Sequence, residues 1–270
     1  MRIQILGTAA AEGWPALFCG CDTCQRARAA GGPNIRSRSS VLIDGRWKID
    51  LPPDTWHHVA TQEIDLSRLG HLFITHTHSD HCDLNTLEFV HPPFALRGET
   101  LLQVYGAPAL QEAVHRRFGQ TPPGVQLHTL EPGQSVNASG LRFTAVRAQH
   151  DPAELCLNYV IQSDTATVLY ASDTGAYEPD VLDMLSGWRF DWIIAECTMG
   201  TLAHDGRYHM TFHDVLRLRE RLTQGATPAS VRTVITHFSH NIGLLHDELE
   251  RIAAPEGVVV AYDGIVLDTA

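Results

Sequence analysis

The sequence predicts an α/β fold, and two features carry that prediction. Short apolar segments rich in β-branched residues recur from one end of the chain to the other, as expected of strands. Helical patterns of apolar residues lie between some of these segments. The chain has 270 residues, 44% of them apolar, which is enough for a sizeable core. Because neither a linker, a low-complexity tract nor an internal repeat is visible, we expect a single domain over residues 1–270.

The expected elements follow one another at short intervals. The expected strands are residues 2–7, 40–43, 47–51, 71–75, 101–105, 141–148, 157–162, 167–171, 192–196, 233–236 and 258–262. The expected helices are residues 107–118, 179–185, 212–223 and 244–253. Residues 2–7 are too short and too polar for a signal-peptide core, and no run approaches the length of a membrane span. We therefore expect a cytoplasmic protein.

The charge balance narrows the classes of partner. The formal net charge is −11. An acidic protein repels phosphate backbones at long range, so general nucleic-acid binding is disfavoured. Bound metal ions can still create a positive pocket inside an acidic shell.

The stretch THTHSDH, residues 75–81, follows an apolar segment and carries four side chains of the kind that bind metals. Residues two apart in an extended segment share one side, so His76 and His78 can face one ion. If a helix opens near Asp80, its first turn would direct Asp80 and His81 toward the same space. A polar turn is the alternative, but four ligand-type side chains at this spacing favour a site for zinc, manganese or iron.

Three more candidate ligands each follow an expected strand. His150 follows residues 141–148, Asp173 follows residues 167–171, and His237 follows residues 233–236. Taken singly, each is most simply a loop or capping residue. Because open sheets collect their sites at the carboxyl ends of strands, the set together indicates one shared site.

This pattern, HxHxDH followed by His, Asp and His after successive strands, resembles the metallo-β-lactamase superfamily over nearly the whole chain. The resemblance implies an αββα sandwich with two mixed sheets flanked by helices. It also implies a dinuclear site with a metal-bridging water or hydroxide as the nucleophile for hydrolysis. It assigns His76, His78 and His150 to one divalent ion (Mn²⁺ or Zn²⁺), Asp80, His81 and His237 to the other, and Asp173 to both.

A second metal motif lies at residues 19–24, where Cys19, Cys21 and Cys24 form CxCxxC. Clustered thiols in a chain without an export signal are more often metal ligands than disulfides, although small buried cysteines are the alternative. His240 can supply the fourth ligand of a tetrahedral zinc site. The cluster resembles one branch of the superfamily, the phosphoribosyl cyclic-phosphate phosphodiesterases of the carbon–phosphorus lyase pathway. The resemblance implies a structural zinc on these four residues.

The same branch implies a late histidine beside the scissile phosphate. His209 fits best by position, and His213 is the alternative. The resemblance makes His209 and Asp80 the catalytic residues, with His209 assisting the leaving oxygen. The Ile49–Asp54 loop departs from the branch, because Pro52 stands where glycine is usual; this puts the substrate in question more than the metals.

The leading function is therefore hydrolysis of a small cyclic phosphate, such as a phosphoribosyl 1,2-cyclic phosphate. The alternatives are a superfamily nuclease that processes tRNA, and a non-hydrolytic cofactor-biosynthesis protein that keeps the fold and the zinc motif. The resemblance also allows a homodimer.

Overall fold

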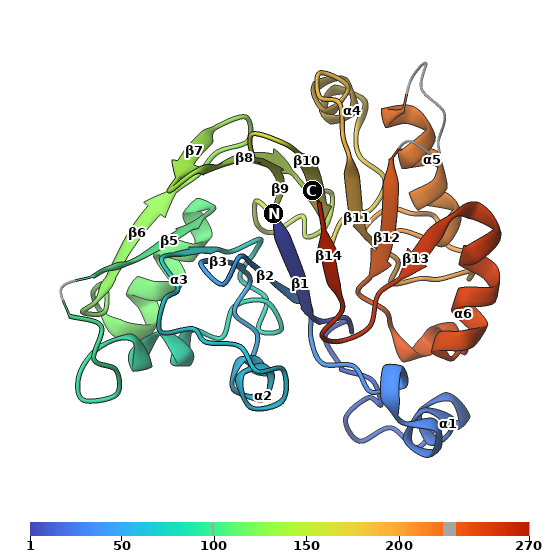
Figure 1. Cartoon of the computed structure of the whole chain (residues 1–270), viewed down its shortest axis with the longest axis horizontal. Coiled ribbons are helices and arrows are strands. Elements are labelled where there is room, and N and C mark those ends of the chain that lie inside the picture. Colours follow the sequence, from blue (N-terminus) through green and yellow to red (C-terminus); the bar gives the residue numbers. More distant parts are fainter. Residues whose placement is uncertain (99, 224–230, 270) are drawn as a thin grey trace.

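The computed structural model describes residues 1–98, 100–223 and 231–269. Within these residues the strands form two seven-stranded mixed sheets, and helices cover the outer faces (Figure 1). The αββα sandwich implied by the resemblance is therefore confirmed.

The first sheet is built mainly from the N-terminal half of the chain. Antiparallel pairs join β14 to β1, β1 to β2 and β2 to β3, and parallel pairs continue from β3 to β6. In spatial order the strands are β14 (Val266–Asp268), β1 (Arg2–Gly7), β2 (Ser40–Ile43), β3 (Trp47–Ile49), β4 (His71–Phe73), β5 (Leu102–Gly106) and β6 (Val125–Thr129).

The second sheet comes from the C-terminal half. Its strands are parallel from β10 to β13 and antiparallel from β7 to β10. In spatial order they are β13 (Val258–Val260), β12 (Arg232–Thr236), β11 (Trp192–Glu196), β10 (Thr167–Ala171), β9 (Leu157–Gln162), β8 (Leu141–Arg147) and β7 (Ser135–Ala138).

Three apolar clusters hold the layers together. One lies between the sheets, where Phe73 of the first stacks on Phe143 of the second with ring centroids 3.9 Å apart. The other two lie under the helices on the outer faces. The helices are α1 (Asp22–Ala30), α2 (Thr55–Thr61), α3 (Pro108–Phe118), α4 (Pro179–Leu185), α5 (Phe212–Leu222) and α6 (His246–Ala253).

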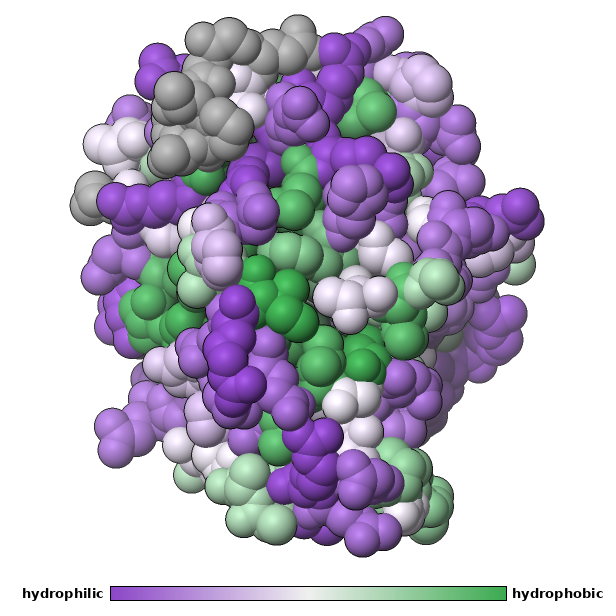
Figure 2. Space-filling model, turned by 90° about the vertical axis from the view of Figure 1, so that its right-hand side faces the viewer, coloured by the Kyte–Doolittle hydropathy of each residue, from purple (hydrophilic) through white to green (hydrophobic). Residues whose placement is uncertain are grey.

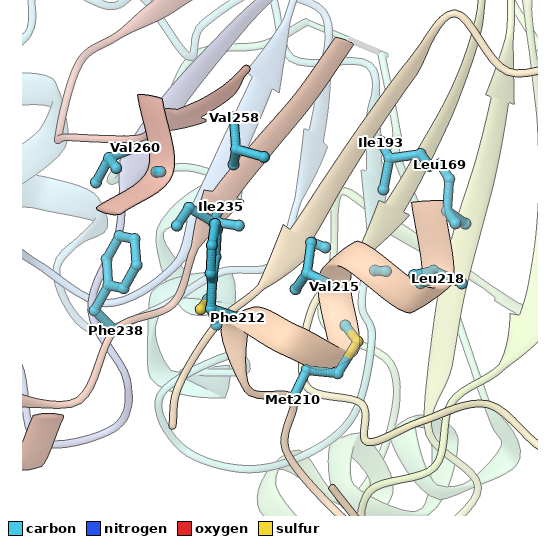
Figure 3. Packing of buried hydrophobic residues seen from close by; sticks show 14 of the residues in the cluster. Leu169, Ile193, Met210, Phe212, Val215, Leu218, Ile235, Phe238, Val258 and Val260 are labelled. Carbon is cyan, nitrogen blue, oxygen red and sulfur yellow. The ribbon is translucent and has the colours of Figure 1, made fainter. Parts of the chain in front are cut away.

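Helix α5 shows how an outer face is covered. Val215 and Leu218 of α5 lie against Ile193 and Leu169 of the second sheet (Figure 3). Viewed from the side that carries α5 and α6, hydrophobic side chains gather in the middle of the surface between hydrophilic margins (Figure 2). Among the described residues, no helix is both long and apolar enough to cross a membrane.

Every predicted strand and helix is present, with ends that differ by at most two residues. The prediction missed β6, β7, β14, α1 and α2. The reason is weak amphipathic patterning: α1 buries only Cys24 and Ala27, and β7 buries only Ala138. Such segments form because neighbouring elements supply hydrogen bonds and packing, which local sequence does not reveal.

Candidate metal centre

The seven predicted ligands converge from loops that follow four strands. The motif at residues 75–81 follows β4, and the three remaining ligands follow β8, β10 and β12. Their ligand atoms form two groups, and within each group all of these atoms lie within 4.8 Å of one another. The groups are His76, His78 and His150, and Asp80, His81, Asp173 and His237.

The local geometry of the motif differs from the prediction in one respect. No helix opens at Asp80; residues 79–81 form a hydrogen-bonded turn, in which the N–H groups of His81 and Cys82 both donate to the carbonyl of His78. This turn, rather than a first helical turn, brings Asp80 and His81 round to the side of the earlier histidines.

Asp173 lies between the two groups. Its Oδ2 is 3.5 Å from His150 Nε2 and 3.3 Å from His81 Nε2, and its Oδ1 is 2.7 Å from His237 Nε2. The carboxylate therefore spans both groups, which is the place the resemblance gives to a bridging ligand.

Two of these ligands sit on left-handed backbone. The φ angles of Asp173 and His237 are 51° and 57°, which non-glycine residues rarely adopt. Such strain is typical of functional sites where surrounding structure holds the turn. Gly175 is needed for a different reason, since an added Cβ would come within 2.2 Å of the carbonyl oxygens of Gly206 and Arg207.

The chemistry of the cluster fits divalent cations. The Nε2 atoms of His76, His81 and His237 and the Oδ1 of Asp173 are buried and have no hydrogen-bond partner among the described residues. Unpaired buried polar atoms are costly in an apolar interior. Imidazole and carboxylate donor atoms gathered within 4.8 Å of one another are what zinc or manganese would bind.

Hydrogen-bond partners outside the ligand cluster determine which nitrogen of each imidazole ring faces the centre. His81 Nδ1 donates to Asp50 Oδ2 over 2.7 Å, and His237 Nδ1 lies 2.8 Å from Thr198 Oγ1. His78 instead uses Nε2, 3.0 Å from Asp151 Oδ2. Because one nitrogen of each ring is engaged outside, the other is left for the metal.

Sequence reasoning missed Asp50. Its carboxylate accepts hydrogen bonds from the main chain and hydroxyl of Thr75 as well as from His81, all while fully buried. Asp50 lies in the Ile49–Asp54 loop, which the sequence marked only as a departure at Pro52. A carboxylate directly after a strand, beside the strand that carries the histidine motif, was the available indication.

Sequence reasoning also missed Glu196, which is the hydrogen-bond partner of His209. His209 Nδ1 donates to Glu196 Oε1 over 2.8 Å, and the His209 ring lies 4.9 Å from that of His150 and 6.0 Å from that of His237. Burial alone would lower the pKa of His209, but the Glu196 carboxylate raises it to about 9. The alternative, His213, is exposed on α5.

The second motif forms a separate cluster, here called the cysteine clip: Cys19, Cys21, Cys24 and His240. Their ligand atoms lie within 4.8 Å of one another, with Cys21 Sγ 3.5 Å from His240 Nδ1. The Cys24 N–H, the His240 side chain and Cys19 lower the pKa of Cys21 to about 6. Three sulfurs and one imidazole suit tetrahedral zinc.

Comparison with known proteins agrees with this geometry. The Beta-lactamase superfamily domain matches residues 40–238. Ribonuclease Z from two BCG strains of Mycobacterium bovis is 24% identical over 177 residues, which cover 59% of this chain. The match spans 61% of the length of these curated relatives.

Three crystal structures share the fold. A diphosphatase of the PhnP family superposes with a TM-score of 0.76 at 23% identity, covering 99% of this chain and 97% of that one. Zn²⁺-bound PqqB from Methylobacterium extorquens superposes with a TM-score of 0.76 at 19% identity, covering 99% of this chain and 100% of that one. The short form of human tRNase Z superposes with a TM-score of 0.70 at 18% identity, covering the whole of both chains. The motif-based resemblance is thus confirmed: the chain belongs to the Beta-lactamase superfamily.

Proposed function

We propose that this protein is a metal-dependent phosphodiesterase that hydrolyses a small phosphate ester, with a cyclic phosphate such as a phosphoribosyl 1,2-cyclic phosphate as the expected substrate. The observation that carries the proposal is the convergence of seven ligand side chains, four of which have an unpaired buried atom, directly beside a Glu196–His209 pair. Two Mn²⁺ or Zn²⁺ ions held there would lower the pKa of a coordinated water and offset charge on phosphoryl oxygens.

The protein's own residues supply orientation and proton transfer. Asp173 spans the two ligand groups and would hold the ions at a fixed separation. Glu196 accepts a hydrogen bond from His209 Nδ1 and favours the protonated form of this ring, so His209 could give a proton to the leaving oxygen. Asp80, 3.2 Å from His81, would serve as a ligand and accept a proton from the attacking water.

A pocket beside the centre supports a small substrate. A hollow of about 420 Å³ adjoins His150 and is lined by Arg147, Asp151, Glu154 and Tyr208, among others. Its volume falls within the usual range for small-molecule sites. Asp151 already bonds His78, so Arg147 is the charged group best placed to attract an anionic substrate.

Hydrolysis assays test the proposal. Metal-loaded protein should turn over bis(p-nitrophenyl) phosphate and cyclic phosphates, and His76→Ala and Asp173→Ala should abolish turnover and lower the metal content. Full activity in both variants would refute the mechanism.

Ribonuclease activity is the second candidate. The names of the curated relatives favour it, and they do not support the expectation that nucleic acid is disfavoured as a partner. The net charge of −11 argues against ribonuclease activity, because it disfavours binding of an RNA backbone. Cleavage of a tRNA precursor, with gel-shift titration against structured RNA, separates the two activities.

The third alternative is a non-hydrolytic cofactor-biosynthesis protein. Bound metal confined to the cysteine clip, where we propose one structural zinc, would favour it. The single-domain organisation over residues 1–270, the cytoplasmic location and the homodimer stay predictions.

A further inference from the structure

Lys48 is the only lysine of the chain, and the other basic residues of the Lys/Arg class are arginines. It lies in the middle of β3 and is fully buried. Its neighbours Trp47 and Ile49 belong to the core between the sheets. Because side chains alternate along a strand, Lys48 points to the opposite face, under the outer layer.

The Lys48 amine donates a hydrogen bond to the peptide carbonyl of Asp50. Its Nζ donates to Ser40 Oγ and to the main-chain oxygen of Asp50. Ser40 Oγ lies 3.1 Å from the same oxygen and 2.8 Å from the carbonyl oxygen of Ile49, so its hydroxyl lies beside the amine at this turn. Burial lowers the pKa of Lys48 to about 7, partly offset by Asp50, and a buried amine of this kind is costly to keep.

Asp50 needs such an anchor. Its φ is 61°, a left-handed value, and the next N–H, that of Leu51, donates to the carbonyl of His81 over 2.7 Å. The Asp50 carboxylate accepts hydrogen bonds from Thr75 and from His81, whereas its main-chain oxygen accepts the one from Lys48. One residue therefore connects the buried amine to a metal-ligand imidazole.

We propose that Lys48 is a positioning residue of the metal centre, which fixes the orientation of the His81 imidazole through Asp50. The inference rests on the metal centre of the proposed function. A purely structural role makes a different prediction: loss of the amine would take a donor from the buried Asp50 carbonyl and lower stability, while metal affinity stayed unchanged. Metal affinity, rather than stability, distinguishes the two.

Lys48→Met tests this directly. Metal-free variant and wild type are titrated with Zn²⁺ or Mn²⁺ in competition with a chromophoric chelator. We expect the same number of sites, but one ion of the centre bound about tenfold more weakly, the lower end of the effect of losing an outer-shell partner. Ile49→Val is the matched control, because it disturbs packing at the next position of β3 without removing the amine; it should keep wild-type affinity.

The single lysine permits a second measurement that needs no variant. Wild-type protein carrying ¹³C-labelled lysine gives one lysine side-chain NMR signal, which should shift when the centre is filled and stay in place when only the clip is filled. Wild-type affinity in Lys48→Met, or an unmoved signal on filling the centre, would overturn the role of Lys48. A wild type that takes up ions only at the clip would instead refute the centre itself.

Discussion

The cysteine clip and the metal centre gather their ligands in opposite ways. Three of the four clip ligands lie within residues 19–24, where Cys21 is exposed and Cys24 is buried in the first turn of α1. The centre draws its ligands from residues 76 to 237, and Asp80, His81, Asp173 and His237 are all buried. Because the centre is more deeply buried, we expect the fold itself to shape it, and we expect the clip to depend more on its ion.

Metal removal gives the largest expected effect. A chelator should empty the centre before the clip, because the centre offers N and O donors whereas three thiolates bind zinc strongly. Activity should fall by on the order of 10³-fold or more, since every ligand serves hydrolysis. Metal content per chain by mass spectrometry, followed over time beside activity, checks the order. Loss of the clip ion first would contradict it.

His209→Ala should lower kcat by about 10²–10⁴-fold, the usual contribution of a general acid, with metal content unchanged. His213→Ala is the matched control, because this exposed histidine of α5 should change kcat less than twofold. Steady-state kinetics with an unactivated leaving group measure both. Equal losses in the two variants would remove the assignment to His209.

Cys24→Ser should affect stability more than chemistry. We expect loss of the clip ion and a fall in Tm of about 5–10 °C, with kcat within about tenfold of wild type. Thermal unfolding and metal analysis of the same preparation provide the check. A variant that loses both classes of ion would show that the centre depends on the clip.

Cys156→Ala should have the smallest effect. Cys156 is buried outside both metal sites, and burial raises the pKa of its thiol to about 12. Removing the sulfur should cost about 1 kcal/mol, a Tm decrease of about 2–4 °C, without loss of metal. Any fall in metal content would mean that this thiol reaches a site after all.

The sequence by itself was sufficient for most strands, for most helices and for both sets of candidate ligands. Periodic apolar segments and clustered donor residues are local features, so they are visible without coordinates. The spacing of the four ligands within residues 76–81, and that of the three cysteines, was enough to identify them. His150, Asp173 and His237 were indicated jointly by their places after expected strands, and the family resemblance then assigned them to particular ions.

Tertiary structure decided what surrounds those ligands. Asp50, Glu196 and Thr198 select the ring nitrogen that faces the centre, and their partners are 31, 13 and 39 residues away in sequence. The choice between His209 and His213 came from which one the fold places beside His150. The buried role of Lys48 likewise depends on a carbonyl that only the left-handed turn at Asp50 presents. The ability of a side chain to bind a metal depends on its residue type, which the sequence gives directly. Its hydrogen-bond partners and its burial arise only when distant segments meet in the fold.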